Sequence, residues 1–364
     1  MSSLAKAKAF CDQFALRCPV LMAPMAGASP VALAAAVTDG GGMAACGVLG
    51  MSPSVIAEWS SSFRAQSGPT APLQLNTWIP DPPALRDPQK ERKMRDFLQR
   101  FGPEVPEAAG DAKVVDFEAQ VAAMIEAKPT VISSIMGLYP QEVVRKMKEQ
   151  KIKWFAVATT VSEAIEAEAA GADAIVAQGM EAGGHRGAFR PETANDLIGL
   201  FALLPQIVDA VKVPVIATGG IADARQAAAA FVLGASAVQI GTGLLRCPEA
   251  GISRVWADAL GQSRPEDTAA TRAFSGRLGR SMKTAYVLAC QQEEAPEPAP
   301  YPVQRGLTTP MRTQAAKTEK LDGMMAWAGQ SAGLASEKSA RQLVADVWIG
   351  AMQMLDPTSP LSKH

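Results

Sequence analysis

The sequence predicts an α/β protein, a TIM (β/α)8 barrel with a small C-terminal helical cap. Eight short apolar runs alternate with alanine-rich segments of helical periodicity, and glycine clusters follow several of the runs. Most runs are apolar throughout, which is typical of parallel strands covered on both faces. A doubly wound open sheet shows the same periodicity and is the alternative. The expected strands are 19–23, 43–46, 72–77, 130–135, 154–158, 172–177, 213–217 and 237–240.

Helix signals lie between these runs. Ser162 and Asp223 are residue types that cap helix N-termini, and Pro30 and Pro53 suit the first turn of a helix. These signals support the alternation of strands and helices that a barrel requires. The expected helices are 30–38, 53–62, 141–150, 162–170, 196–211 and 223–233.

The pattern is interrupted twice. Residues 79–115 form a long connection rich in proline and charge, with a helix expected over about 88–101. After residue 260 the alternation stops: 268–290 has a helical pattern, 293–300 is a polar, proline-rich connector, and 336–354 is a further helix. We therefore expect a barrel over 1–260, a helical cap over 261–335 and a C-terminal helix over 336–364 that returns to the barrel.

The composition excludes several classes of function. The 364 residues carry a formal net charge of −1, which provides no overall field for nucleic acid or an acidic membrane surface. Five scattered cysteines include no CxxC pair, so neither a disulfide framework nor a metal site is expected. No apolar run has the character of a signal peptide or a membrane span. We expect a cytoplasmic protein.

One internal histidine, His185, lies in a glycine-rich run directly after the sixth expected strand. Histidine has an unperturbed pKa near neutrality and suits proton transfer or hydrogen bonding to a substrate. The neighbouring Gly183, Gly184 and Gly187 would let the backbone approach a ligand closely. A histidine that only packs in a loop is the alternative. Its place at the C-terminal end of a barrel strand favours an active site.

Glycines also follow strands seven and eight, where barrels commonly bind phosphate. Gly219 with Gly220, and Gly241 before Thr242, are the expected phosphate-binding turns. Neither a GxGxxG fingerprint nor a Walker-type lysine loop is present.

Polar residues at the other strand ends suit a flavin ring. Asn76 and Gln178 are expected to bond the ring's polar edge, and the backbone of Pro24, Met25 and Ala26 is expected beside its reactive nitrogen. Together with the phosphate turns, these positions favour flavin mononucleotide (FMN) as the cofactor.

Longer motifs resemble those of the nitronate monooxygenase family, formerly called 2-nitropropane dioxygenases, and in particular its class I members. They are spread over most of the chain, and the three motifs nearest the C-terminus are the most specific. The motifs are APMAG (23–27), QGMEAGGHRG (178–187), ATGGIADAR (217–225), VQIGTGLL (238–245), FSGRLGR (274–280), YPVQRGLTTPMR (301–312) and WAGQSAGLA (327–335).

The resemblance implies an FMN enzyme that oxidises alkyl nitronates with O2 to carbonyl compounds and nitrite. It implies that His185 is the active-site histidine and that Glu181 orients its loop. Separately from the resemblance, the cap segment is a candidate dimer surface, so a homodimer is one possible assembly. The residues that the resemblance assigns to the cofactor are Asn76, Gln178, Gly183, Gly220, Gln239, Ile240, Gly241 and Thr242. Gly184, next to Gly183, is also expected to contact the cofactor.

One segment departs from the family pattern. Class I members commonly carry an aromatic- and histidine-containing stretch on strand four, where this chain has SSIMG over 133–137. The departure leaves FMN binding in place and puts the substrate in question. Trp78, two residues after Asn76, either lines the pocket or packs in the barrel.

Three other functions are compatible with parts of the sequence. FMN-dependent NAD(P)H reductases, of the enoyl-acyl-carrier-protein or quinone type, share the histidine loop and the glycine turns. A noncatalytic ligand-binding barrel is a second alternative, and an enzyme of phosphate-sugar metabolism is a third. The motifs over 301–312 and 327–335 favour the monooxygenases over the reductases.

Overall fold

The structure, a computed structural model that describes residues 2–356, contains a barrel of eight parallel strands. The expected strands are all present and pair in the order β1-β9-β8-β6-β5-β4-β3-β2. The barrel closes where Met22 donates its backbone N–H to Met43 at 3.0 Å and Met43 donates to Val20 at 3.2 Å. This closure excludes the open doubly wound sheet. The strands are β1 (Val20–Met22), β2 (Ala44–Gly47), β3 (Leu73–Trp78), β4 (Val131–Ile135), β5 (Lys153–Ala158), β6 (Ala174–Gln178), β8 (Val215–Thr218) and β9 (Ala237–Ile240).

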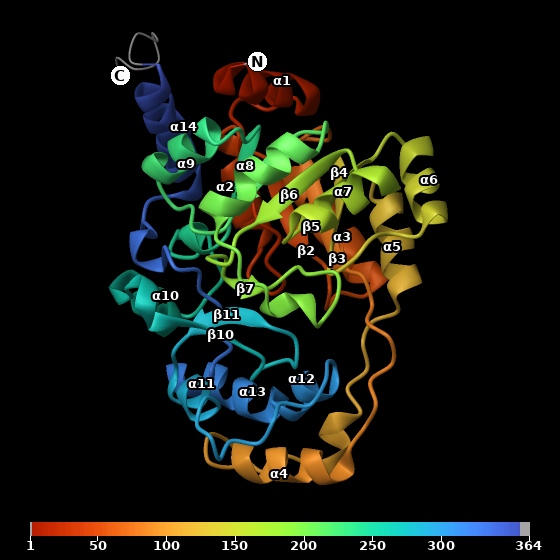
Figure 1. The fold of residues 1–364 in the computed structure, drawn as a ribbon, viewed down its shortest axis with the longest axis vertical. Coiled ribbons are helices and arrows are strands. Elements are labelled where there is room, and N and C mark those ends of the chain that lie inside the picture. The colour runs from red at the N-terminus through yellow and green to blue at the C-terminus, as the bar shows by residue number, and fades with distance from the viewer. Residues whose placement is uncertain (1, 357–364) are drawn as a thin grey trace.

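Helices surround the barrel and cover its outer face (Figure 1). Between the strands and the helices lies the main apolar core, which alanine, valine, leucine and isoleucine side chains dominate. The surrounding helices are α2 (Val31–Asp39), α3 (Pro53–Ser67), α5 (Phe117–Glu126), α6 (Gln141–Glu149), α7 (Val161–Ala170), α8 (Leu200–Ala210), α9 (Ala224–Val232) and α14 (Ala340–Leu355).

The predicted helix starts differ in detail from the structure. Asp223 caps α9 as expected, accepting from the backbone N–H groups of Arg225 and Gln226 at 2.9 and 3.1 Å. Pro53 occupies the first turn of α3, but Pro30 is the N-cap of α2. The Ser162 prediction is wrong, because Thr160, an extended residue two positions after β5, caps α7 instead. The predicted helix over 196–211 begins only at Leu200.

An N-terminal helix that sequence periodicity did not single out fills the barrel interior at the N-terminal ends of the strands. Helix α1 (Ser3–Phe14) places Phe10 and Phe14 against Phe155 of β5, with ring centroids 6.3 and 5.2 Å from the Phe155 ring. Phe10 is 1 % exposed. This end of the barrel is thus closed by packed side chains, as in other barrels of this size.

A second lobe lies beyond the C-terminal ends of the strands (Figure 1). The prediction of a helix over 268–290 is wrong: this stretch contains β10 (Thr268–Thr271), β11 (Gly279–Met282) and the short helix α11 (Ala285–Ala289). Strand β11 pairs antiparallel with β10 and, on its other side, with β7 (Gly184–His185) from the histidine loop. Pairing across the sheet overrides the helical pattern of an alanine-containing segment.

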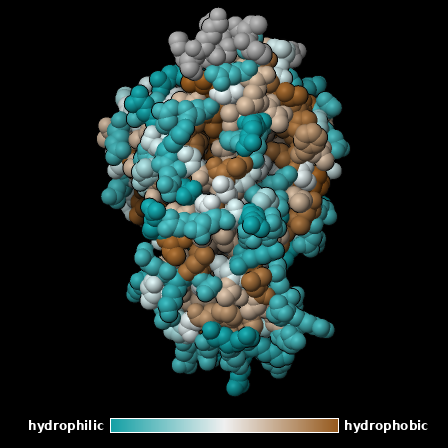
Figure 2. Space-filling model, turned by 90° about the vertical axis from the view of Figure 1, so that its left-hand side faces the viewer, coloured by the Kyte–Doolittle hydropathy of each residue, from teal (hydrophilic) through white to brown (hydrophobic). Residues whose placement is uncertain are grey.

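The long connection after β3 joins this lobe. Its helix α4 (Pro88–Leu98) buries Met94 and Leu98 against Phe274, Tyr286 and Met311. We call the lobe formed by residues 88–110 and 268–335 the cap. In the space-filling view the barrel and the cap meet at a narrower waist (Figure 2). The cap also contains α12 (Val303–Leu307) and α13 (Thr309–Lys317).

The last described helix, α14, packs against α2 and α9. Trp348 of α14 lies against Phe231 of α9 with the ring centroids 5.6 Å apart. Residues 357–364 of the predicted C-terminal segment lie outside the described residues. Within 2–356, none of the helices combines the length and the apolar character needed to cross a membrane.

The aromatic plug yields a stability prediction. Phe10→Ala should lower the free energy of unfolding by about 3–5 kcal/mol, because it removes a fully buried aromatic side chain and leaves a cavity. Urea unfolding followed by circular dichroism measures this loss. Phe201→Ala, at a position that is 75 % exposed on α8, should change it by less than about 0.5 kcal/mol. Equal losses in the two variants would show that α1 does not support the barrel.

Candidate active site

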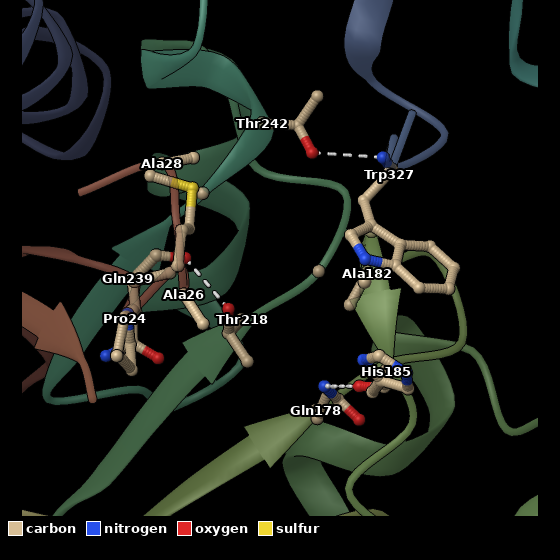
Figure 3. Close-up of a pocket in the computed structure, with 18 of the residues that line it drawn as sticks. Pro24, Ala26, Ala28, Gln178, Ala182, His185, Thr218, Gln239, Thr242 and Trp327 are labelled. Carbon is tan, nitrogen blue, oxygen red and sulfur yellow. Dashed lines mark hydrogen bonds between the residues drawn. The ribbon is translucent and has the colours of Figure 1, made fainter. Parts of the chain in front are cut away.

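A cavity opens at the C-terminal ends of the barrel strands, between the barrel and the cap. All eight barrel strands, or the loops that follow them, contribute lining residues, and three segments of the cap contribute others (Figure 3). Apart from Ile240, it collects the residues that the sequence assigned to the cofactor. These are Pro24, Met25, Ala26, Asn76, Gln178, Gly183, Gly184, Gly219, Gly220, Gln239, Gly241 and Thr242. Ile240 is fully buried in the core, and its carbonyl accepts the N–H of Ala23 at 2.8 Å.

The turns after β8 and β9 form a cradle of free N–H groups. Gly219 and Gly220 both have positive φ, at 105° and 68°, which only glycine adopts without strain. Within residues 2–356, no hydrogen bond uses the backbone N–H groups of Gly219, Gly220, Gly241 or Thr242. Backbone donors left unpaired beside a cavity are suited to bind the oxygens of an anion such as phosphate.

Hydrogen bonds from the cap hold this cradle in place. Ser331 donates its hydroxyl to the carbonyl of Gly220 at 2.8 Å, and the N–H of Gly329 donates to Oγ1 of Thr242 at 3.0 Å. At Gly183 a Cβ would lie 2.4 Å from the N of Gly329, so only glycine fits there. The loops after β6, β8 and β9 are therefore held at one spacing by a cap segment.

Amide side chains line the opposite part of the cavity. Asn76 and Gln239 are buried, at 6 % and 4 % exposed, and both line the cavity. Gln178 donates from Nε2 to the carbonyl of His185 at 3.1 Å and accepts the N–H of Gly187 at Oε1, 2.8 Å away. Because a carbonyl only accepts and an N–H only donates, these two bonds fix the orientation of the Gln178 amide.

His185 is placed by both lobes. Its backbone lies in β7, paired with Gly279 of the cap, and its Nε2 lies 2.7 Å from Oγ of Ser275. The imidazole sits between the indole rings of Trp78 and Trp327, with centroids 4.5 and 4.6 Å away and both contacts edge-on. Trp78 thus lines the cavity and also packs against the histidine. Figure 3 shows Trp327 next to His185, facing Pro24 and Gln239 across the cavity.

Arginines of the cap lie near the histidine, and among residues 2–356 the charges that shift its pKa are all positive. Burial, with the nearby charges of Arg305, Arg277 and Arg312, lowers the pKa of His185 to about 3. The imidazole is therefore neutral at physiological pH. Arg305 lines the cavity itself, while the side chain of Arg277 is only 4 % exposed and lies 2.9 Å from Asp81.

Glu181 orients the histidine loop, as the resemblance implied. Its carboxylate accepts the N–H of Leu200 through both oxygens, at 2.9 and 3.0 Å, at the positive N-terminus of α8. Its carbonyl accepts the N–H of Gln330 from the cap at 2.9 Å. Both bonds hold the backbone and leave Glu181 outside the lining of the cavity.

Sequence reasoning did not assign a role to Ser275, Arg305, Trp327 or Ser331. All four lie in the C-terminal motifs that it quoted, and each lines the cavity. The quoted motifs therefore contained these residues. Their distance from His185, however, depends on the pairing between β7 and β11, which the motifs do not show. On the atypical strand four, Ile135 lines the cavity and Ser133 is fully buried.

The chain is similar to several known proteins over most of its length. The profile of the family described as Nitronate monooxygenase matches residues 8–349. The nitronate monooxygenase of Paraburkholderia phytofirmans is 36 % identical over 335 residues, which are 90 % of this chain and 91 % of that protein. The solved structure of nitroalkane oxidase from Streptomyces ansochromogenes has a TM-score of 0.86 and 34 % identity, covering 96 % of this chain and 100 % of that one. FabK from Thermotoga maritima has a TM-score of 0.75 and 28 % identity, covering 96 % and 97 %.

The lowered pKa of His185 predicts a pH dependence of stability. Because its pKa in the folded chain, about 3, lies below the ordinary value of 6.5, the unfolded chain binds the proton first. The stability that the neutral His185 contributes is fully present above pH 6.5 and is lost as the pH falls toward 3. His185→Asn should therefore lose less stability between pH 7 and pH 5 than the wild-type chain, as measured by urea unfolding. Equal losses would show that the folded histidine takes up a proton freely.

Proposed function

The chain belongs to the nitronate monooxygenase family, whose members are flavin-dependent oxidoreductases acting on nitronates, and we propose that it holds FMN at the mouth of the barrel and uses His185 to bind the nitronate. The proposed reaction converts an alkyl nitronate and O2 into a carbonyl compound and nitrite. Its small-molecule partners are thus the nitronate and O2. A homodimer, a cytoplasmic location and the domain division at residues 260 and 335 stay predictions.

The residues present fit FMN. Unpaired N–H groups of Gly219, Gly220, Gly241 and Thr242 would bind the phosphate, and a side chain at Gly183 would collide with backbone atoms of the cap. Asn76, Gln178 and Gln239 would meet the polar edge of the ring, and the turn at Met25 would lie beside it. Bound there, FMN would accept electrons from the nitronate and pass them to O2.

The observation that carries the proposed function is a neutral histidine beside an arginine that faces the cavity. A nitronate is an anion that has already lost its carbon proton, so no base is needed to begin the reaction. Neutral His185 donates an N–H to a nitronate oxygen, and Arg305 supplies the opposite charge. The 2.7 Å contact with Ser275 fixes the direction of the imidazole ring.

The turn after β1 holds the other wall of the site in place. The N–H of Met25 donates to Oγ of Ser29 at 3.0 Å, and that hydroxyl donates back to the carbonyl of Met25 at 2.9 Å. The N–H of Ala28 donates to the same carbonyl at 2.9 Å. The wall opposite His185 is therefore fixed by its own hydrogen bonds, and the nitronate lies between it and the two tryptophans.

A reductase is the second candidate, because FabK from Thermotoga maritima shares the fold. The proposal is tested by recording the visible spectrum of the purified protein under anaerobic conditions. Propionate-3-nitronate should reduce the bound flavin, and NADPH added alone should leave it oxidised. Reduction by NADPH alone would assign the chain to the reductases, and a protein without flavin that does not bind added FMN would overturn the cofactor.

Arg305 gives a quantitative test of anion binding. Arg305→Leu should lower kcat/KM for a nitronate roughly 10- to 100-fold, because one charge-assisted interaction with the substrate is lost. Arg145→Leu, at a side chain that is 70 % exposed on α6, is the matched control and should leave kcat/KM unchanged. If the two variants behave alike, Arg305 does not bind the substrate.

A further inference from the structure

Next to the cavity, four polar side chains form a chain of hydrogen bonds inside the barrel. Gln239 of β9 donates from Nε2 to Oε1 of Gln74 at 3.2 Å, and Gln74 of β3 donates from Nε2 to Oγ of Ser133 at 2.8 Å. Asn76 donates from Nδ2 to the same Oγ at 2.9 Å. Gln74 and Ser133 are 1 % and 0 % exposed, and neither lines the cavity. A buried polar layer of this kind is costly unless every member is paired.

Two backbone carbonyls fix the direction of this chain. Nδ2 of Asn76 lies 3.1 Å from the carbonyl of Ser133, and Nε2 of Gln239 lies 3.5 Å from the carbonyl of Met22. A carbonyl oxygen only accepts, so both amides must turn their NH2 groups toward the barrel wall. Gln74 then accepts from Gln239 and donates to Ser133, which is the one arrangement consistent with both ends.

The amide oxygens of Asn76 and Gln239 are the groups left for a ligand. Neither Oδ1 of Asn76 nor Oε1 of Gln239 accepts a hydrogen bond from a residue in 2–356, while both side chains line the cavity. Gln178 faces the same cavity with its amide orientation fixed by His185 and Gly187. The layer therefore offers acceptors, and the polar edge of a flavin ring carries one N–H donor between two carbonyls.

We propose that Gln74 and Ser133 are positioning residues that hold the Asn76 and Gln239 amides with their oxygens toward the ring N–H of FMN. This inference rests on the proposed function, since it requires FMN in the cavity. Gln74 is the more important of the two. Without it, the NH2 group of Gln239 keeps only the 3.5 Å contact with Met22, and its amide is free to turn over. Loss of the Ser133 hydroxyl leaves Asn76 its bond to the Ser133 carbonyl.

The test uses the holoenzyme reconstituted with 15N-labelled FMN and compares wild type with Gln74→Met and Ser133→Ala. In the wild type the ring N–H proton should exchange slowly with solvent. Gln74→Met should speed that exchange at least about tenfold and weaken FMN binding roughly tenfold, which is the worth of one buried hydrogen bond. Ser133→Ala should show smaller changes in the same direction.

Ser134→Ala is the matched control. Ser134 is the next residue on β4, equally buried, and it accepts from Nε1 of Trp154 at 3.0 Å on the other face of the strand. The Ser134→Ala variant should be less stable than the wild type and should show no change in the exchange of the ring proton. If Gln74→Met and Ser133→Ala also lose only stability, the inference is wrong. If the wild-type chain binds no FMN, the proposed function fails instead.

Discussion

The short pairing between β7 and β11 is the constraint on which the active site depends. Through it, a barrel loop that is rich in glycine becomes one edge of the cap's sheet, with His185 opposite Gly279 and Gly184 opposite Arg280. The same sheet brings Ser275 to the imidazole. A glycine-rich loop by itself has high conformational entropy, so the cap contributes order as well as side chains.

The charge distribution around the histidine follows from this assembly. The cap delivers arginines to a region that burial has largely removed from water, where Asp81 lies 2.9 Å from Arg277 and Glu192 also acts on that guanidinium. Burial outweighs the effect of that arginine and raises the pKa of Asp81 above its ordinary value. Positive charge in a low-dielectric site attracts an anion strongly, because little solvent screens it. The site thus favours anionic substrates before any specific contact is made.

The barrel was predictable from the sequence, whereas the geometry of the cap was not. Continuous apolar runs and capping residues such as Asp223 report local structure, and the eight strands follow from them. Strand β10 has the sequence TAAT and β11 has GRSM, which carry no alternating pattern, so their pairing is imposed by tertiary contacts. Likewise, the depth of Gln74 and Ser133 below the cavity depends on strand register, which periodicity does not give.

The cap is assembled from segments far apart in the chain, and this has a consequence during synthesis. Met94 and Leu98 of α4 are buried against Phe274, Tyr286 and Met311. On the ribosome, α4 emerges about 200 residues before the last of these partners, a delay of roughly 10–40 s at ordinary elongation rates. Until these partners emerge, the apolar face of α4 lacks the side chains that cover it in the folded cap, and chaperone binding can compete with aggregation during that period.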